Sequence, residues 1–428
     1  MPATLPMVSL IIPTHQESPS LRGTLPALLE QTYPPERFEV LIVTDTLSEG
    51  VAEFVKSLGA RFELKVLQQP GQGPGMRRNA GAANSRGEIL IFIDDDILAS
   101  PQLLEAHVDA HQHAPSSVVI GYFPPVVRER ADFFRIELKD WWESNFQAMA
   151  EASHRFSYRD LLSGNFSIGR ELFERVNGFD TRFPCRDDYE LGFRLIAAGA
   201  QIAFCRTARG DHLDRTDLAR LLKRKQLEGR WDCELGRLHP QLRPDLLMNY
   251  LIEFSLVASR ILRFLAFRWR RGGDALAAGL RQSSVFCERF RLRGLWRRLF
   301  LGLQFYHYWR GVAESLGSLE QVRDYLDVSP LRLDEAGPDL VLDLSRGIRE
   351  AEQLLDQYRP QSVSIQHDGQ PVGRVLPQPG AEKLRGVHLR PILTHEFAWP
   401  FLKALAIEQA SGIPLRSPGA QGNAEAVQ

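Results

Sequence analysis

The feature that most constrains the fold is a series of short apolar runs that end at polar residues and alternate with helix-like segments. Residues 8–13 and 38–43 are two such runs, followed by Thr14 and Thr44, and leucines recur at helical spacing over 21–31 between them. The runs are apolar throughout rather than alternating, so we expect strands that are buried on both faces. A mostly parallel sheet with helices on both faces is the α/β class that fits.

The same alternation continues to residue 93. The pattern predicts helices over 50–58 and 76–85 and strands over 62–67 and 88–93. In open parallel sheets, ligands bind beyond the carboxyl ends of the strands. The polar groups that directly follow strands, at 14–17, 44–45 and 94–96, are therefore the candidate site residues.

Three consecutive carboxylates, Asp94, Asp95 and Asp96, follow the fourth strand. If the strand geometry continues, Asp94 and Asp96 project to one side and Asp95 to the other. Such a pair can share a hard divalent cation, or one acid can bind the cation and the other a ribose hydroxyl. A solvated acidic turn is the alternative, and the position at a strand end favours the ligand site.

Composition and cysteine usage exclude several classes of protein. The formal charge of −1 over 428 residues gives no general electrostatic basis for binding nucleic acid. The four cysteines have no metal-site spacing and fit a reducing compartment. No basic region precedes the first apolar run, and no stretch of about 20 residues lacks charge. These observations predict a cytoplasmic protein without a spanning helix.

The pattern changes after about residue 116. We predict a strand over 118–121, helices over 132–152 and 187–198, the second ended by Gly199, and mostly helices over 217–325. After Pro338 the sequence pattern predicts a small β-containing appendage. Its expected strands cover 363–366, 373–376 and 386–389, and the tail beyond about 416 is expected to be disordered.

The segment 260–298 is locally basic inside a nearly neutral chain. It holds eleven arginines against Asp274 and Glu288, interleaved with leucine, phenylalanine and tryptophan. This composition is typical of an interfacial membrane contact, although a solvated face or an oligomer contact has the same pattern. We predict peripheral contact with an anionic membrane.

Five stretches resemble the GT-A family of inverting glycosyltransferases, family 2, and occur in family order between residues 8 and 200. They read VSLIIPTHQE (8–17), FEVLIVTD (38–45), GMRRNAGAANSRGEILIFIDDDI (75–97), LLSGNFSIGRELFERVNGFDTRF (161–183) and RDDYELGFRLIAAGA (186–200). The resemblance implies a GT-A fold, a nucleotide-diphosphate sugar donor and Mn²⁺ or Mg²⁺.

The resemblance also implies roles for individual residues. The residues expected to bind the donor are Pro13, Thr14, Glu17, Asp45, Arg78, Asn79, Asp94 and Asp95. Asp96 and His212 are expected to bind the metal, although a lone histidine is as often structural. Gly164 and Asn165 are expected at the acceptor site, with a plain turn as the alternative. Asp188 is the expected catalytic base and Asp187, where glutamate is usual, its rival; helix N-terminal acids are the bland alternative.

Together, the resemblance and the sequence pattern beyond it predict five parts of the chain. They are a nucleotide-sugar-binding half over 1–115, an acceptor-binding and catalytic half over 116–235, an arginine-rich helical region over 236–330, a small β-containing region over 331–415 and a tail over 416–428. The implied reaction moves a sugar to a hydroxyl of a glycan or lipid-linked glycan at the cytoplasmic face of a membrane. A sugar nucleotidyltransferase and a catalytically inactive nucleotide-sugar-binding scaffold are the competing functions.

Overall fold

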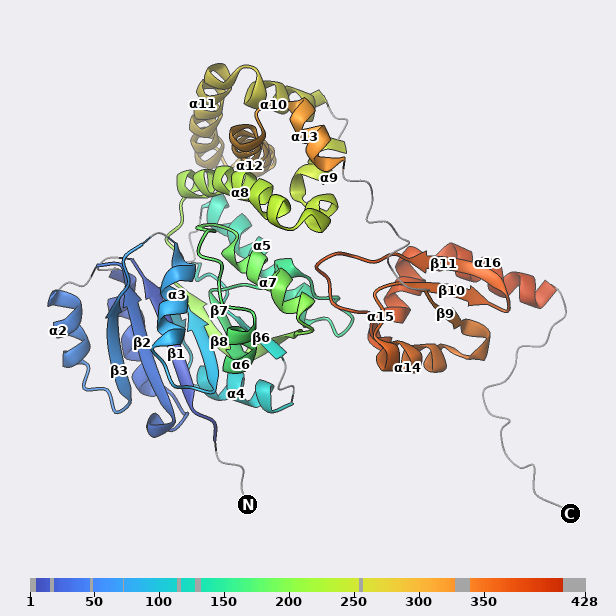
Figure 1. Cartoon of the computed structure of the whole chain (residues 1–428). Coiled ribbons are helices and arrows are strands. Elements are labelled where there is room, and N and C mark those ends of the chain that lie inside the picture. Colours follow the sequence, from blue (N-terminus) through green and yellow to red (C-terminus); the bar gives the residue numbers. More distant parts are fainter. Residues whose placement is uncertain are drawn as a thin grey trace, which may run out of the picture. The chain divides into compact units, whose positions relative to one another are not determined.

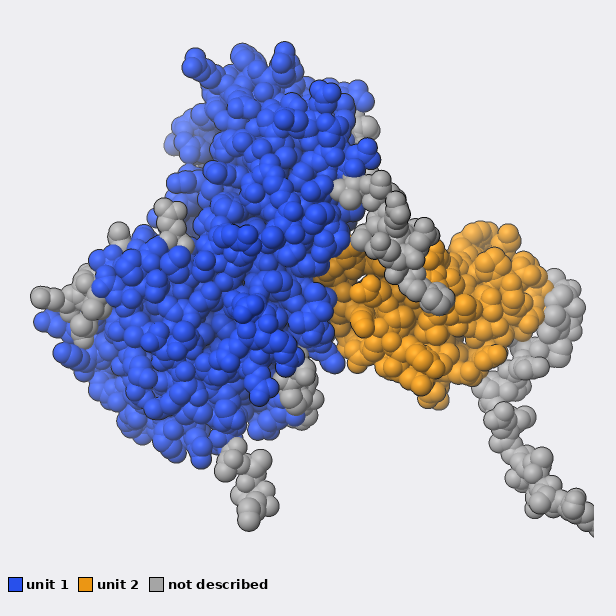
Figure 2. Space-filling view, viewed as in Figure 1, with its two compact units in different colours: residues 1–150, 156–328 blue, residues 151–155, 329–428 orange. Residues whose placement is uncertain are grey.

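The computed structural model describes residues 5–15, 19–46, 49–71, 73–113, 117–127, 132–253, 257–327 and 339–410. Its internal contacts divide the chain into two compact units. Unit 1 comprises residues 1–150 and 156–328, and unit 2 comprises residues 151–155 and 329–428 (Figure 2).

Unit 1 contains an eight-stranded sheet (Figure 1). Its strands are β1 Val8–Thr14, β2 Phe38–Thr44, β3 Glu63–Gln68, β4 Ile89–Ile93, β5 Ile97–Ala99, β6 Ser117–Tyr122, β7 Asn165–Gly169 and β8 Gln201–His212, in the order β3-β2-β1-β4-β7-β6-β8-β5. β3, β2, β1 and β4 are mutually parallel. β7 runs antiparallel to β4 and β6, and β8 pairs parallel with β6 and antiparallel with β5. The predicted parallel arrangement therefore holds for the first half, and its strands β1, β2 and β4 are wholly buried.

Helices cover both faces of this sheet. Those of the first half are α1 Pro19–Thr24, α2 Glu49–Ser57, α3 Pro74–Ala83 and α4 Leu103–His113, and those of the second half are α5 Phe133–Ala150, α6 Arg170–Arg175 and α7 Asp187–Ala197. Asn165 and Ser167 of β7 bond to His107 of α4, whereas Phe166 packs on Phe179, which α3 holds through Asn79. Because neighbouring strand residues point to opposite faces, α4 and α3 lie on opposite sides.

Two helix boundaries differ from the predicted ones for a local reason. The helix expected over 21–31 ends as α-helix at Thr24 and continues over 25–30 as a 3₁₀ helix. Pro26 has no N–H to donate, which prevents a regular α-helix from continuing there. α3 begins at Pro74, two residues earlier than expected, because proline suits the first turn of a helix.

The C-terminal part of unit 1 is helical. It consists of α8 Leu218–Leu238, α9 Leu247–Glu253, α10 Val257–Phe267, α11 Arg270–Arg289, α12 Arg293–Leu316 and α13 Leu319–Leu326. α8 and α12 approach closely because glycine lies at their contact. A Cβ on Gly229 would lie 2.1 Å from the Tyr308 carbonyl oxygen, and one on Gly311 would lie 1.8 Å from that of Gln226. Among the described residues, no helix is long and apolar enough to cross a membrane.

Unit 2 is built on a three-stranded sheet. Its elements are β9 Leu340–Asp343, α14 Ile348–Tyr358, β10 Val363–His367, β11 Gln370–Val375, α15 Gly386–Pro391 and α16 Ala398–Ala410, with β10 between β9 and β11. The predicted strand over 386–389 is wrong, because those residues form α15. The N–H of Gly386 donates to Asp356 of α14 at 2.9 Å, a tertiary contact that starts the helix. The tail beyond 416 lies outside the described residues.

Candidate active site

The ends of β1, β2 and β4 lie side by side, as the order of the strands requires. Thr14, the last residue of β1, donates a hydrogen bond to the Asp95 carboxylate. Asp45, directly after β2, pairs with His15. The Asp95 carbonyl also accepts from Thr24 at 2.8 Å, so Asp95 ties the triplet to β1 and α1. Sequence reasoning placed Thr14, Asp45 and Asp95 together, and the structure brings them together.

Arg78 is the cation at the centre of the site. Its side chain is 2% exposed, and one Nη donates to Asp94 at 2.7 Å while the other lies 3.4 Å from the Asp187 carboxylate. It also donates to the Ser163 carbonyl at 3.3 Å and lies over the Phe179 ring. One buried arginine therefore joins the acidic triplet to the acidic pair that starts α7.

Asp96 faces a different neighbour from Asp94. The sequence predicted both on one side if the strand continued, but β4 ends at Ile93 and residues 95–96 form a turn, so the alternation stops. The Asp96 carboxylate lies 3.4 Å from Nε2 of His212, at the end of β8. Its carbonyl accepts from the N–H of Leu213 at 2.8 Å, which holds the two segments together.

The chemistry of Asp96 and His212 fits a divalent cation. Oxygen and imidazole nitrogen both suit Mn²⁺, and Mg²⁺ is commonly held by one or two carboxylates with the substrate supplying phosphate oxygens. Nδ1 of His212 is buried and has no hydrogen-bond partner among the described residues. Among the described residues, no group of three or more His, Cys, Asp or Glu side chains is arranged to hold a metal ion.

Asp187 and Asp188 open α7 but differ in their surroundings. Burial and the charge of Asp188 raise the pKa of Asp187 to about 7, against the opposing charge of Arg78. Burial also raises the pKa of Asp188, although Arg224 and Arg186 oppose the shift. Asp187 is almost fully buried against Arg78, whereas Asp188 is half-buried and its carboxylate accepts only the N–H of Tyr189 among the described residues. Asp188 is thus the more accessible of the two acids.

Arg186 anchors this acidic pair to the helical part of the unit. Its backbone is left-handed (φ 67°), which is uncommon for a residue other than glycine. Its Nε donates to Asp232 of α8 at 2.7 Å, and the guanidinium lies over Tyr189, 4.3 Å from the ring centre. Asp232 in turn accepts from the hydroxyl of Tyr308 on α12 at 2.7 Å. The N-terminus of α7 is therefore fixed by side chains of α8 and α12.

Sequence reasoning missed Arg77 and Arg186. Arg77 is buried beside Asp45 and Asp95, and burial lowers its pKa. Its adjacency to Arg78 was the only sequence feature that could have indicated a place in the site. Gly75, two residues before Arg77, lies at a close contact: a Cβ on it would lie 3.2 Å from the Asp187 carboxylate.

Three predicted ligand residues have structural partners instead. Asn165 was expected at the acceptor site, but it is 0% exposed and its amide bonds to His107 at 2.9 Å and to the Ala208 carbonyl at 2.9 Å. The amide of Asn79 holds the backbone of Phe179 at 2.8 and 2.9 Å. Pro13 is buried within β1.

Gly164 lies against the acidic triplet. The carbonyl of Gly164 accepts the N–H of Asp94 at 3.0 Å, and a Cβ there would lie 3.2 Å from the Asp94 carboxylate. Gly164 therefore supports the triplet. Trp141 is 53% exposed, whereas Trp142 packs against His212. Glu17 lies outside the described residues.

A buried polar network supports the sheet beneath the site. His111 bonds to Ser167 at 2.8 Å, Ser167 to His107 at 2.8 Å, and His107 to Asn165 at 2.9 Å. Burial lowers the pKa of both histidines to about 4. Neutral imidazoles therefore link α4 to β7 at neutral pH.

We expect this network to make the free energy of unfolding depend on pH between about 6.5 and 4. In that range the unfolded chain binds protons that the two buried histidines do not. Stability therefore falls with decreasing pH, by up to about 1.4 kcal/mol per pH unit for each histidine. Urea unfolding at several pH values measures the slope, and His111→Gln should reduce it. An unchanged slope would contradict the assignment.

Two curated proteins and one protein family are similar to this chain in sequence. The family described as "Glycosyl transferase family 2" matches residues 9–176. Validoxylamine A glucosyltransferase from Streptomyces hygroscopicus subsp. limoneus is 29% identical over 314 residues, which cover 64% of this chain and 68% of the relative. Glycosyltransferase AglE from Haloferax volcanii is 28% identical over 246 residues, covering 56% of this chain and 77% of the relative.

A solved structure is also similar. Mannosyltransferase PcManGT from Pyrobaculum calidifontis, in complex with GDP-Man and Mn²⁺, is 18% identical, with a TM-score of 0.48, and the similarity covers 71% of this chain and 87% of that one. The family match spans β1 to α6, including the strand ends that carry Thr14, Asp45 and the acidic triplet. Over these residues the sequence is therefore similar to that of family 2 glycosyltransferases.

Proposed function

We propose that this glycosyltransferase moves a sugar from a nucleotide-diphosphate donor to an acceptor hydroxyl with inversion, and that Asp188 is the general base. The observation that carries the proposal is the position of Arg78 between Asp94 and Asp187. That arginine places the acids that follow β4, and those that begin α7, around one site. Donor-binding groups and a proton acceptor are then close enough to act on the same substrate pair.

The proton acceptor follows from the different surroundings of the two acids. Asp187 is held by Arg78 and is nearly inaccessible, so it orients the arginine. Asp188 is only partly buried, and its raised pKa makes it a stronger base than an ordinary aspartate. It would accept the proton of the acceptor hydroxyl as that oxygen attacks the anomeric carbon. A single displacement breaks the bond to the diphosphate and inverts the configuration.

The donor-side residues would hold the nucleotide and its diphosphate. Asp45 and Asp94 would bind the base and the ribose, and Asp96 with His212 would hold Mn²⁺ or Mg²⁺. A divalent cation there would supply stabilisation of the negative charge that develops on the diphosphate. Arg77 and Arg78 add fixed positive charge on the same side.

A screen of nucleotide sugars by thermal shift tests the donor and metal assignments together. We expect one nucleotide sugar to raise the melting temperature with Mn²⁺, and less so with EDTA. Asp96→Ala should lose the metal-dependent part of the shift and keep the rest. An equal shift in this variant would remove Asp96 from the metal site.

The products distinguish the competing functions. Release of a nucleoside diphosphate supports glycosyl transfer, pyrophosphate chemistry supports a sugar nucleotidyltransferase, and neither product supports an inactive scaffold. Asp45, Asp94, Asp96 and Asp188 together argue for activity. We further propose that the acceptor is a glycan or lipid-linked glycan, and that residues 260–298 contact an anionic membrane at its cytoplasmic face.

A further inference from the structure

The eleven arginines of residues 260–298 fall into two groups. Four have partners within unit 1: Arg263 and Arg270 donate to backbone carbonyls, and Arg293 and Arg297 pair with Glu137 of α5. The side chains of the other seven have no hydrogen bond or ion pair within the described part of the chain. These are Arg260, Arg268, Arg271, Arg281, Arg289, Arg291 and Arg298. Only this second group is available to an external anion.

The α11–α12 turn, residues 285–295, combines unpaired arginines with exposed apolar side chains. Val285, Phe286, Phe290, Leu292 and Leu295 are each 42–60% exposed. The turn is tight, because the N–H of residue 292 donates to the carbonyl of residue 287 at 2.8 Å. A local surface that is both apolar and cationic matches the interface of an anionic bilayer.

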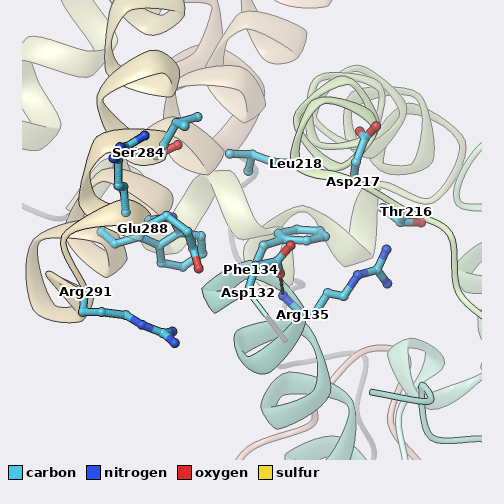
Figure 3. Close-up of a pocket in the computed structure, with 12 residues that line it drawn as sticks. Asp132, Phe134, Arg135, Thr216, Asp217, Leu218, Ser284, Glu288 and Arg291 are labelled. Atoms are coloured by element: carbon cyan, nitrogen blue, oxygen red, sulfur yellow. Dashed lines mark hydrogen bonds between the residues drawn. The ribbon is translucent and has the colours of Figure 1, made fainter. Parts of the chain in front are cut away.

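A pocket of about 610 Å³ lies beside the α11–α12 turn (Figure 3). Its volume is in the range of ligand pockets, about 300–1,000 Å³. The lining comes from the starts of α5, α8 and α12 and from the end of α11 with the turn that follows it. Phe134, Leu218, Val285 and Trp296 supply the apolar part, and Arg135, Arg289 and Arg291 the cations.

The acidic side chains of the pocket are engaged by backbone N–H groups. Asp132 accepts from Arg135 at 2.8 Å, Asp217 from Arg220 at 2.8 Å, and Glu288 from Phe133 at 2.7 Å. These bonds cap the starts of α5 and α8 or link α11 to α5. The arginines, by contrast, keep most of their N–H groups unused, since only Arg135 donates, to the Asp214 carbonyl at 3.1 Å. The lining holds three acids and three arginines, but the unused donors of Arg289 and Arg291 are available to an anionic ligand.

We propose that this pocket and the α11–α12 turn form a binding site for an anionic phospholipid. Arg289 and Arg291 would bind the phosphate, and the apolar wall would accept the adjoining hydrocarbon. The exposed phenylalanines and leucines of the turn would enter the membrane interface. The proposal deepens the proposed membrane contact of residues 260–298 and rests on it.

Calorimetric titration with short-chain lipids tests the site without a membrane. The probes are dihexanoyl phosphatidic acid, dihexanoyl phosphatidylcholine and inorganic phosphate. We expect the phosphatidic acid to bind at least tenfold more tightly than either of the other two. Equal binding of phosphate would assign the site to a free anion, and equal binding of phosphatidylcholine would assign it to hydrocarbon alone; both results overturn the proposal.

Variants separate the pocket from general surface charge. Arg289→Gln with Arg291→Gln should weaken phosphatidic acid binding at least tenfold and reduce flotation with phosphatidylglycerol vesicles. Arg281→Gln, an exposed arginine of α11 outside the pocket lining, is the matched control and should leave phosphatidic acid binding unchanged. Equal losses in both variants would overturn the site. Nucleotide-sugar binding should persist in all variants, so failure of this proposal is distinguishable from failure of the proposed function.

Discussion

Asp188→Asn is expected to lower the transfer rate about a thousandfold, because general base catalysis contributes about 10² to 10⁴. Asparagine keeps the size of the side chain and the start of α7 but cannot accept the proton. Donor affinity should stay within about twofold, since among the described residues the Asp188 carboxylate accepts only a neighbouring backbone N–H. Single-turnover transfer and a donor-binding titration measure the two quantities separately.

Asp187→Asn is the matched control for that prediction. Its side chain lies at the same helix start, but it contacts Arg78 rather than open space. We expect a loss of about tenfold, through the orientation of Arg78, and a change in donor affinity that Asp188→Asn lacks. If Asp187→Asn abolished transfer while Asp188→Asn retained it, the roles of the two acids would be reversed.

The pH profile gives a further check on the base. Burial raises the pKa of Asp188, so the fraction of base in the carboxylate form falls earlier than for an ordinary aspartate as the pH decreases. Activity should therefore decline on the acidic side from a pH above the usual aspartate range near 4. The residual activity of Asp188→Asn should lack this decline.

The parts of the site that sequence predicts are those fixed by strand ends. Thr14, Asp45 and the acidic triplet each follow an apolar run, and parallel strands bring such ends to one edge. The triplet's internal division was not predictable, because the turn at 95–96 depends on partners such as Thr24 and Leu213. These contacts join residues that are distant in the sequence, so local sequence patterns cannot predict them.

Asn165 and residues 386–389 failed for the same physical reason. The Ser163-Gly164-Asn165 sequence fits a turn at a ligand site equally well, and only the burial of Asn165 against His107 decides against it. Residues 386–389 follow a turn signal and have strand-like composition, but Asp356 caps them as a helix. Tertiary partners distant in sequence overrode local preference in both places.

Arg186 shows why the helical part of unit 1 belongs to the site. Its partner Asp232 is 46 residues away, so the sequence offered no sign of the pair. The contact depends on α8 and α12 approaching closely, which Gly229 and Gly311 permit, and this approach lets Tyr308 reach Asp232. Arg186 is therefore a positioning residue for Asp187 and Asp188.

Asp232→Asn is expected to destabilise the fold by about 3–5 kcal/mol, because it leaves the buried Arg186 guanidinium without its main carboxylate. The transfer rate should also fall at least tenfold with donor affinity unchanged. Arg186 directly precedes Asp187, the first residue of α7, so its movement would displace the two acids. Chemical unfolding and steady-state kinetics measure these effects. Glu234→Gln on the same helix, which removes an exposed pair with Arg237, is the control and should change neither.

The pH profile separates positioning from simple loss of stability. The charge of Arg186 lowers the pKa of Asp188, against the effect of burial. If Asp232→Asn lets the guanidinium move away, the pKa of the base rises further, and the acidic decline of activity shifts to higher pH. Global destabilisation alone reduces the amount of active enzyme and leaves the decline in place. Asp232→Glu, which restores the carboxylate, should return the profile towards that of the wild type, and a profile unchanged in Asp232→Asn would remove Arg186 from catalysis.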